Sequence, residues 1–192
     1  LRAIRAAGGE VACERAVLAV GHSARDTFVA LHQNGVYFEP KAFSVGVRIE
    51  HLQSEIDRAL YGKYAGHPLL PPAEYNLSRR AGGRACYTFC MCPGGVVVAA
   101  QSEEHTVVTN GMSYHERSGK NANAAIAVSV DPKDYDDGTP FGGASLQRQI
   151  ERAAFAQTGS YRAPCQRVGD FLAGKPSKAA GAEVGGQAVL GR

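Results

Sequence analysis

The chain has 192 residues, of which 44% are hydrophobic and 20% charged, as in a folded globular protein and unlike a disordered or fibrous one. Its formal net charge of +3 is mild, and the basic residues form no stripe, so nucleic-acid binding has no support. No apolar run reaches the ~20 residues that cross a bilayer. We therefore expect neither a nucleic-acid nor a membrane partner.

The cysteine content and the start of the chain bear on its compartment. Five cysteines, an odd number, do not suggest a disulfide framework, and reduced thiols are the simpler interpretation. No charged-then-apolar signal segment follows Leu1, which favours a protein that is not secreted. We expect a cytoplasmic or organellar location, a plastid included. A start at leucine also leads us to expect that an upstream segment has been removed.

The first predicted elements are a strand and a helix. Residues 15–20 form a short apolar run that ends at Gly21, which is typical of a strand buried on both faces of a parallel sheet. A helix is predicted next, because Ser23 can cap it and apolar residues recur until Asn34 and Gly35. The turn between them lies where α/β folds bind ligands through backbone N–H groups.

The central region is predicted to contain a mixture of strands and helices. Residues 43–50 alternate between apolar and polar side chains, as in a half-buried strand, and Arg48, Glu50 and His51 read as its solvated end. A helix is predicted at 54–61, a functional loop at 62–83, and strands on both sides of Pro93, at 106–109 and at 124–130. A helix at 145–157 should stop at Gly159, and a linker or frayed end should follow Gly174.

A serine nucleophile is one alternative for the turn at Gly21. The segment from Gly21 to Arg25 is one residue away from the G-x-S-x-G nucleophile elbow, with Arg25 in place of its last glycine. A triad needs an acid and then a histidine farther along the chain, and no histidine follows His115. A hydrolase that uses Ser23 is therefore the weaker alternative, and a simple turn with a capping serine is the plain one.

Three cysteines lie at even spacings along a predicted strand. Cys86, Cys90 and Cys92 have one parity, so we expect their thiols to share a face. Their C-x3-C-x-C spacing lacks the paired C-x2-C of zinc and iron–sulfur sites, so no metal is predicted. A buried apolar role is the plain interpretation. A thiol beside a cofactor is the sharper one, with Cys92 best placed at the strand end.

A polar segment follows the predicted strand at 106–109. Residues 109–115, Thr-Asn-Gly-Met-Ser-Tyr-His, bring donors, acceptors and one titratable ring into a glycine-containing loop. Such a loop is a candidate pocket wall. A plain polar turn is the alternative.

Five strings carry a family resemblance. AVLAVGHSARDTF, FSVGVRIEH, FCMCPGGVVVAA, VVTNGMSYHERSGKNAN and APCQRVGDFLAGKPS resemble, in order and spacing, a family of uncharacterised FAD-dependent dehydrogenases related to NAD(P)/FAD-dependent oxidoreductases. The resemblance extends from residue 15 to residue 177. It implies an α/β (mixed α+β) chain. Residues 1–40 would end a Rossmann-like FAD/NAD(P)-binding fold, residues 41–165 would be an inserted mixed-sheet substrate domain, and 166–192 a return segment or linker.

The same resemblance implies a function. The chain would be part of an FAD-dependent oxidoreductase that acts on a small-molecule substrate, with NAD(P)H as a candidate reductant. The substrate, the catalytic residues and the oligomeric state are not indicated. The implied cofactor-binding residues fall in two groups, near the flavin nucleotide and over the isoalloxazine ring: Gly21, His22, Ser23, Arg25 and Asp26, and then Cys90, Cys92, Asn110, Gly111, Met112 and Ser113.

One departure from the family pattern limits this expectation. The chain contains no G-x-G-x-x-G turn, which in such proteins binds the pyrophosphate. FAD is therefore expected in the full-length parent, and this chain alone is expected to hold it poorly and to be inactive. The second hypothesis is a non-catalytic binding or interaction module, in which the glycines and cysteines are only structural.

Overall fold

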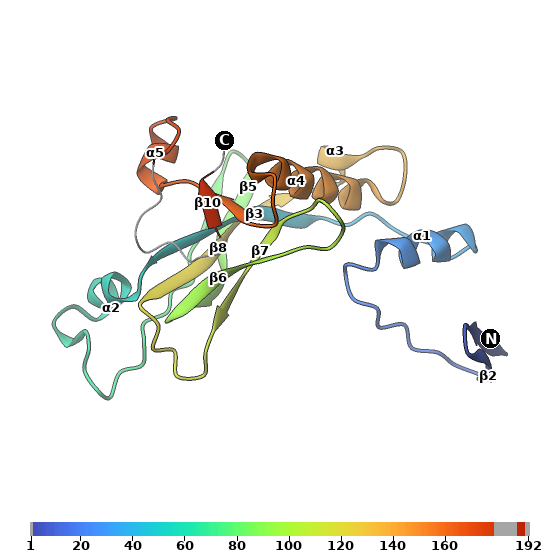
Figure 1. Cartoon of the computed structure of the whole chain (residues 1–192), viewed down its shortest axis with the longest axis horizontal. Helices are drawn as coiled ribbons and strands as arrows, with labels where there is room; N and C mark the ends of the chain where they lie inside the picture. The colour runs from blue at the N-terminus through green and yellow to red at the C-terminus, as the bar shows by residue number, and fades with distance from the viewer. Residues whose placement is uncertain (1, 179–187, 191–192) are drawn as a thin grey trace. The chain divides into compact units, whose positions relative to one another are not determined.

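The computed structural model describes residues 2–178 and 188–190. Two compact units, residues 1–38 and 39–192, make up the chain (Figure 1). Together they contain helices and several antiparallel sheets, so the predicted mixed α/β class is confirmed. No helix within the described residues is both long and apolar enough to cross a bilayer.

The first unit contains a hairpin and one helix. Strands β1 (Ala3–Ala6) and β2 (Gly9–Ala12) pair with each other, and α1 covers Arg25–Gln33. Residues 15–20 form no strand, and Val17 is 94% exposed, so the predicted buried strand is wrong. A strand buried on both faces needs a neighbour on each side. The only strands described in this unit, β1 and β2, pair with each other.

The predicted helix of this unit is present with a different start. Helix α1 has Ala24 at its N-cap position, so the prediction of Ser23 as the N-cap residue is wrong. Its predicted end is confirmed, because Asn34 is the C-cap and donates from Nδ2 to the Ala30 carbonyl (2.7 Å). Gly35 follows at φ +85°, a conformation that favours glycine.

The second unit is built on a four-stranded antiparallel sheet. Its order is β3 (Phe43–Leu52), β8 (Asn121–Val130), β5 (Arg84–Cys92) and β4 (Ser78–Ala81). Strands β3 and β8 pair over their whole length, from Phe43 opposite Val130 to Leu52 opposite Asn121. The strands predicted at 43–50 and 124–130 are thus confirmed. Their antiparallel pairing allows the alternating pattern of β3.

A two-stranded hairpin forms a second sheet. Strands β6 (Gly95–Ala100) and β7 (Val108–Ser113) pair antiparallel. The strands predicted on both sides of Pro93 exist, but β5 and β6 belong to different sheets, so the turn between them carries the chain from one sheet to the other. Strand β7 contains most of the segment predicted as a polar loop at 109–115, and that prediction is wrong.

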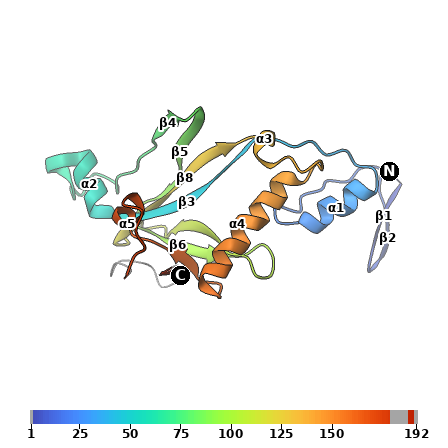
Figure 2. The same cartoon turned by 90° about the horizontal axis from the view of Figure 1, so that it is seen from above.

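Helices lie at both ends of the long β3–β8 pair (Figures 1 and 2). Helix α2 (Gln53–Tyr61) follows β3 and leads into the short helix η1 (Gly62–Tyr64), whereas α3 (Pro132–Tyr135) and then α4 (Gly142–Thr158) follow β8. The predicted helices at 54–61 and 145–157 are confirmed, and α4 stops at Gly159 in the left-handed conformation. Arg148 of α4 forms a two-pronged ion pair with Glu103 (2.7 and 2.8 Å), which fixes α4 to the loop between β6 and β7.

The end of the unit is less regular. Strand β9 (Ala163–Cys165) pairs in parallel with β10 (Ala188–Leu190), and α5 covers Val168–Leu172. The segment 166–192, which was expected to be a return segment or linker, therefore contains a short helix and a strand. The rest of that prediction falls on residues 179–187 and 191–192, outside the described residues.

Little apolar side-chain volume is fully buried among the residues that the structure describes. The largest fully buried side chains described are Asn123 and Thr106, which are both polar. Large apolar residues are exposed instead, such as Val47 (68%), Phe89 (64%) and Met112 (56%). Val47 and Phe89 lie opposite adjacent residues of β8, Ile126 and Ala125, so they belong to opposite faces of the main sheet and do not form one patch.

An ion pair fixes α3 to the main sheet and predicts acid sensitivity. Arg84 of β5 binds both carboxylate oxygens of Asp134 (2.5 and 2.6 Å), and this contact lowers the pKa of Asp134 from 3.8 to about 2. A carboxyl with a lowered pKa stabilises the fold above its unfolded pKa, and this contribution is lost as the pH falls through the folded pKa. We expect unfolding stability to decline between about pH 4 and pH 2.

The Asp134→Asn variant tests this prediction. It removes the charge but keeps an oxygen that can accept from the Asp131 backbone N–H, as Asp134 Oδ2 does (2.9 Å). We expect the variant to be less stable than the wild type at pH 7 and to lose less stability on acidification, measured by urea unfolding at several pH values. Equal pH dependence of both proteins would contradict the assignment.

Candidate functional site

A β-bulge near the end of β5 separates Cys90 from Cys92. Phe89 lies opposite Ala125 and Cys92 opposite Asn123, so three steps on β5 match two on β8. One extra residue is therefore inserted, as in a bulge, and Cys90 has φ +47°, which is uncommon for a residue other than glycine. The bulge leaves Cys90 exposed and Cys92 7% exposed.

The bulge also overturns the expectation that three thiols share a face. Cys86 lies opposite Val128, whose partner on β3 is Val45, whereas Cys92 lies opposite Asn123, whose partner is Glu50. Residues directly opposite share a face, and the faces alternate along a strand. Cys86 and Cys92 therefore lie on opposite faces of the sheet. Among the described residues, no group of three His, Cys, Asp or Glu could hold a metal ion.

Arg48 of β3, two strands away in the same sheet, holds the bulge. Its Nη2 donates to the Cys90 carbonyl (2.6 Å) and lies 3.6 Å from Cys92 Sγ, and that thiol donates to the same carbonyl (3.3 Å). Burial raises the pKa of Cys92, the Cys90 thiol raises it further, and the Arg48 charge partly opposes both effects. Arg48 is half-buried, so its interpretation as part of a solvated strand end is wrong.

Gly111 lets the β6–β7 hairpin lie close to Arg48 and Asn123. A Cβ at Gly111 would lie 2.2 Å from Arg48 Nη2 and 2.2 Å from Asn123 Oδ1. Asn123 is completely buried, and both polar atoms of its side chain lack a hydrogen-bond partner, as does Nε of Arg48. Unpaired buried polar atoms are uncommon in proteins. The space between the layers is thus polar and tightly filled around Gly111.

The turn after Cys92 is fixed at three points. Ser113 Oγ donates to the Pro93 carbonyl (2.8 Å), the Gly94 N–H donates to Gln53 Oε1 (2.9 Å), and the Gly119 N–H donates to the Gly94 carbonyl (3.2 Å). These groups come from β7, α2 and the loop before β8. The segment 90–95, which we call the bulge turn, is therefore held by hydrogen bonds from three different parts of the second unit.

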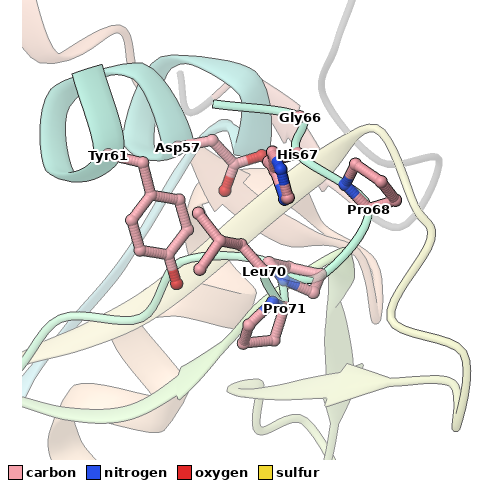
Figure 3. Close-up of a pocket in the computed structure, with 8 residues that line it drawn as sticks. Asp57, Tyr61, Gly66, His67, Pro68, Leu70 and Pro71 are labelled. Carbon is pink, nitrogen blue, oxygen red and sulfur yellow. The ribbon is translucent and has the colours of Figure 1, made fainter. Parts of the chain in front are cut away.

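A pocket lies between α2 and the loop that follows it (Figure 3). Figure 3 shows Asp57 and Tyr61 of α2 facing Leu70 and Pro71 of the following loop. The pocket has a volume of about 270 Å³. Gln53 links it to the bulge turn, because its Nε2 donates to Asp57 Oδ1 (2.8 Å) while its Oε1 accepts from Gly94. The full lining is Asp57, Tyr61, Gly66, His67, Pro68, Leu70, Pro71 and Pro72.

A half-buried histidine–tyrosine pair lies at the end of β3. His51 Nε2 and the Tyr75 hydroxyl are 2.7 Å apart. Burial lowers the pKa of His51 and raises that of Tyr75, so both groups are neutral at pH 7. The sequence pattern missed this pair, because Tyr75 lies in the long loop and no local signal joins it to β3.

The six residues expected over the flavin ring do not share one surface. Along β7, Gly111 faces Arg48 of the main sheet and Ser113 bonds to the carbonyl of Pro93 in the turn after β5. Cys92 of β5 lies on the same inner side, beside Arg48. Asn110 and Met112 have the opposite parity and are exposed on the outer face of the hairpin, with Val98 and Val96 opposite them. Cys90 is exposed at the bulge. The structure thus divides the six into an inner group of three, an outer group of two, and Cys90 by itself at the bulge.

The residues expected near the flavin nucleotide all lie in the first unit. Gly21, His22 and Ser23 are exposed, with Ser23 Oγ 3.2 Å from His22 Nε2, while Arg25 is 6% exposed and Asp26 Oδ1 accepts from the Thr27 N–H (2.8 Å). A nucleophile elbow needs a strand before the serine, and residues 15–20 form none. The hydrolase alternative therefore loses its structural basis.

Comparison with known proteins gives the family. Residues 42–187 match the family described as "FAD-dependent protein, C-terminal domain-like", and this match covers most of the chain. The chain belongs to this family. An uncharacterized protein of Clostridium beijerinckii is 48% identical over 175 residues, which are 90% of this chain and 33% of that protein. The chain thus spans about a third of the length of that relative.

The family membership supports FAD as the cofactor of the full-length parent. The inner cluster of Arg48, Gly111 and Asn123 does not fit a flavin ring, because Asn123 is completely buried and a single Cβ at Gly111 would already collide. The outer face of the hairpin fits better. It offers Val96 (42% exposed) and Met112 (56% exposed) as apolar surface beside the Asn110 amide.

Proposed function

We propose that the chain is the substrate-side part of an FAD-dependent oxidoreductase and that its second unit covers the flavin. When bound, FAD supplies the electron transfer. Met112 and Val96 would exclude water from one face of the ring, and the Asn110 amide would hydrogen-bond to its polar edge. The family match carries this proposal, and the apolar outer face of the hairpin supports it.

The wider parts of the proposal concern the whole protein. Residues 1–40 would belong to the FAD-binding Rossmann-like fold, with the turn at Gly21–Asp26 near the nucleotide. A small-molecule substrate, NAD(P)H as reductant and a cytoplasmic or organellar location complete the proposal. The pocket at Asp57 is a candidate site for a small polar molecule.

The test of the cofactor is the visible absorbance of the full-length protein, purified without added FAD. A flavin spectrum in that protein and none in residues 1–192 alone is the expected result. A colourless full-length protein that takes up no FAD on reconstitution would overturn the proposal.

The outer face has a test of its own, the Met112→Glu variant of the full-length protein. A carboxylate against the ring should weaken FAD binding by about tenfold or more, or ~1.4 kcal/mol, measured by titration of the apoprotein. Leu77→Glu is the matched control, because Leu77 is also exposed (61%) and lies in a loop. Equal affinity in Met112→Glu and the wild type would remove the outer face from the site and leave the cofactor assignment intact.

A non-catalytic interaction module is the second candidate function. The exposed apolar side chains favour it, because such surface also serves protein partners. The flavin spectrum distinguishes the two candidates, since an interaction module would fold as a colourless protein.

A further inference from the structure

The two cysteines of the bulge turn differ in access although one residue separates them. Cys90 is exposed, and Cys92 is 7% exposed. In the regular strand predicted from the sequence, both thiols would point to one face and have equal access. The inserted residue and the left-handed Cys90 produce the difference. An accessible thiol beside a protected one is the arrangement of an attacking and a resolving cysteine.

The surroundings hold the Cys92 thiol against the backbone of Cys90. Cys92 Sγ lies 3.3 Å from the Cys90 carbonyl, and the Cys90 thiol is close enough to raise the pKa of Cys92. Arg48 Nη2 contacts the same carbonyl and lies 3.6 Å from Cys92 Sγ. The rest of the turn is fixed through Gln53, Ser113 and Gly119. The pair therefore cannot separate without breaking several hydrogen bonds.

We propose that Cys90 and Cys92 form a redox-active dithiol that exchanges with a disulfide-bearing oxidant such as a low-molecular-weight disulfide. Nothing in this proposal requires the flavin. The spacing supports a reversible role, because a disulfide across one intervening residue closes a small, strained ring, and strained disulfides are the labile ones.

The reaction takes place in two balanced steps. The deprotonated sulfur of Cys90 attacks one sulfur of the oxidant, its disulfide bond breaks, and the leaving thiolate takes up a proton. The thiol of Cys92 then loses its proton and attacks the Cys90 sulfur, which releases the second thiol of the oxidant. Two protein thiols become one disulfide, and one small disulfide becomes two thiols.

Arg48 and burial divide the roles between the two cysteines. Burial keeps Cys92 protonated and out of reach of the oxidant, so Cys90 attacks first. Arg48 Nη2 lies close enough to stabilise the Cys92 thiolate in the second step. Cys86 lies on the other face of the sheet and is not part of the pair.

The test uses glutathione disulfide on the reduced full-length protein, with peptide mapping by mass spectrometry after alkylation of free thiols. The wild type should lose two hydrogen atoms in the peptide that contains Cys90 and Cys92 and should carry no glutathione. Cys92→Ser should instead keep glutathione on Cys90, roughly tenfold more than the wild type, because the resolving thiol is missing. Cys90→Ser should leave Cys92 unmodified in the folded protein.

The controls separate the pair from general thiol reactivity. Cys86→Ser should behave like the wild type, and circular dichroism should show that each variant is folded. Stable glutathione on Cys90 in the wild type, or no reaction at either cysteine, would overturn the proposal. Because the readout is thiol chemistry, it holds or fails whether or not the protein binds FAD.

Discussion

Replacing Gly111 with alanine should lower the free energy of unfolding by about 1–3 kcal/mol, the usual cost of overpacking a tight interior. The added Cβ would lie 2.2 Å from both Arg48 Nη2 and Asn123 Oδ1. Neither side chain can move aside cheaply, because Arg48 is bound to the Cys90 carbonyl and Asn123 is completely buried. Urea unfolding followed by circular dichroism measures the change, since the chain has no tryptophan for fluorescence.

Gly169→Ala is the matched control for this variant. Gly169 lies in α5, and a Cβ there meets nothing within 4 Å. We expect no loss of stability, because alanine favours a helix over glycine. If both variants lost the same stability, or if Gly111→Ala were as stable as the wild type, the tight contact between β7 and the main sheet would be wrong.

Elements whose signal is local were predicted well from the sequence. The alternation of β3 depends only on which face is half-buried, so a period of two gave the strand without knowledge of its partner. Helix α4 and its end at Gly159 follow from apolar spacing and from the left-handed conformation that glycine tolerates. The family resemblance likewise depends on contiguous strings, and the match over residues 42–187 confirms it at the family level.

Features that depend on distant contacts were not predicted. The alternating pattern of Cys86, Cys90 and Cys92 contains no sign of the bulge, because an inserted residue depends on the pairing of β5 with β8. His51 read as a solvated strand end because Tyr75, its partner, lies in a loop far along the chain. The apolar run at 15–20 predicted a strand, but a strand needs neighbours, and none in the described first unit pairs with it.

A similar limit applies to the candidate site. The sequence singled out residues of the bulge turn and of β7 as one group, but the parity of β7 places Gly111 inside and Met112 outside. The sequence could not show this, because it predicted a loop there, and a loop has no fixed parity. Gln53 was missed for the opposite reason. It reads as an ordinary helix-start residue, and only the fold brings Gly94 to its side chain.

Replacing Gln53 with leucine should lower the free energy of unfolding by about 2–4 kcal/mol, because a buried unpaired polar group costs about 1–3 kcal/mol. Gln53 is 6% exposed and bonds to three partners: Gly94, Asp57 and the Ala73 carbonyl (2.9, 2.8 and 3.1 Å). Leucine fills a similar volume but leaves the Gly94 N–H and the Ala73 carbonyl without this partner. Urea unfolding of the variant and the wild type measures the difference.

The same variant has a second readout that a general loss of stability would not reproduce. Gln53 anchors the bulge turn, so its loss should also let alkylating reagents reach Cys92 faster under conditions in which the protein remains folded. Gln157→Leu is the control, because Gln157 is exposed on α4 and should change neither quantity. Lower stability with unchanged Cys92 reactivity would show that Gln53 supports α2 and its loop without holding the bulge turn.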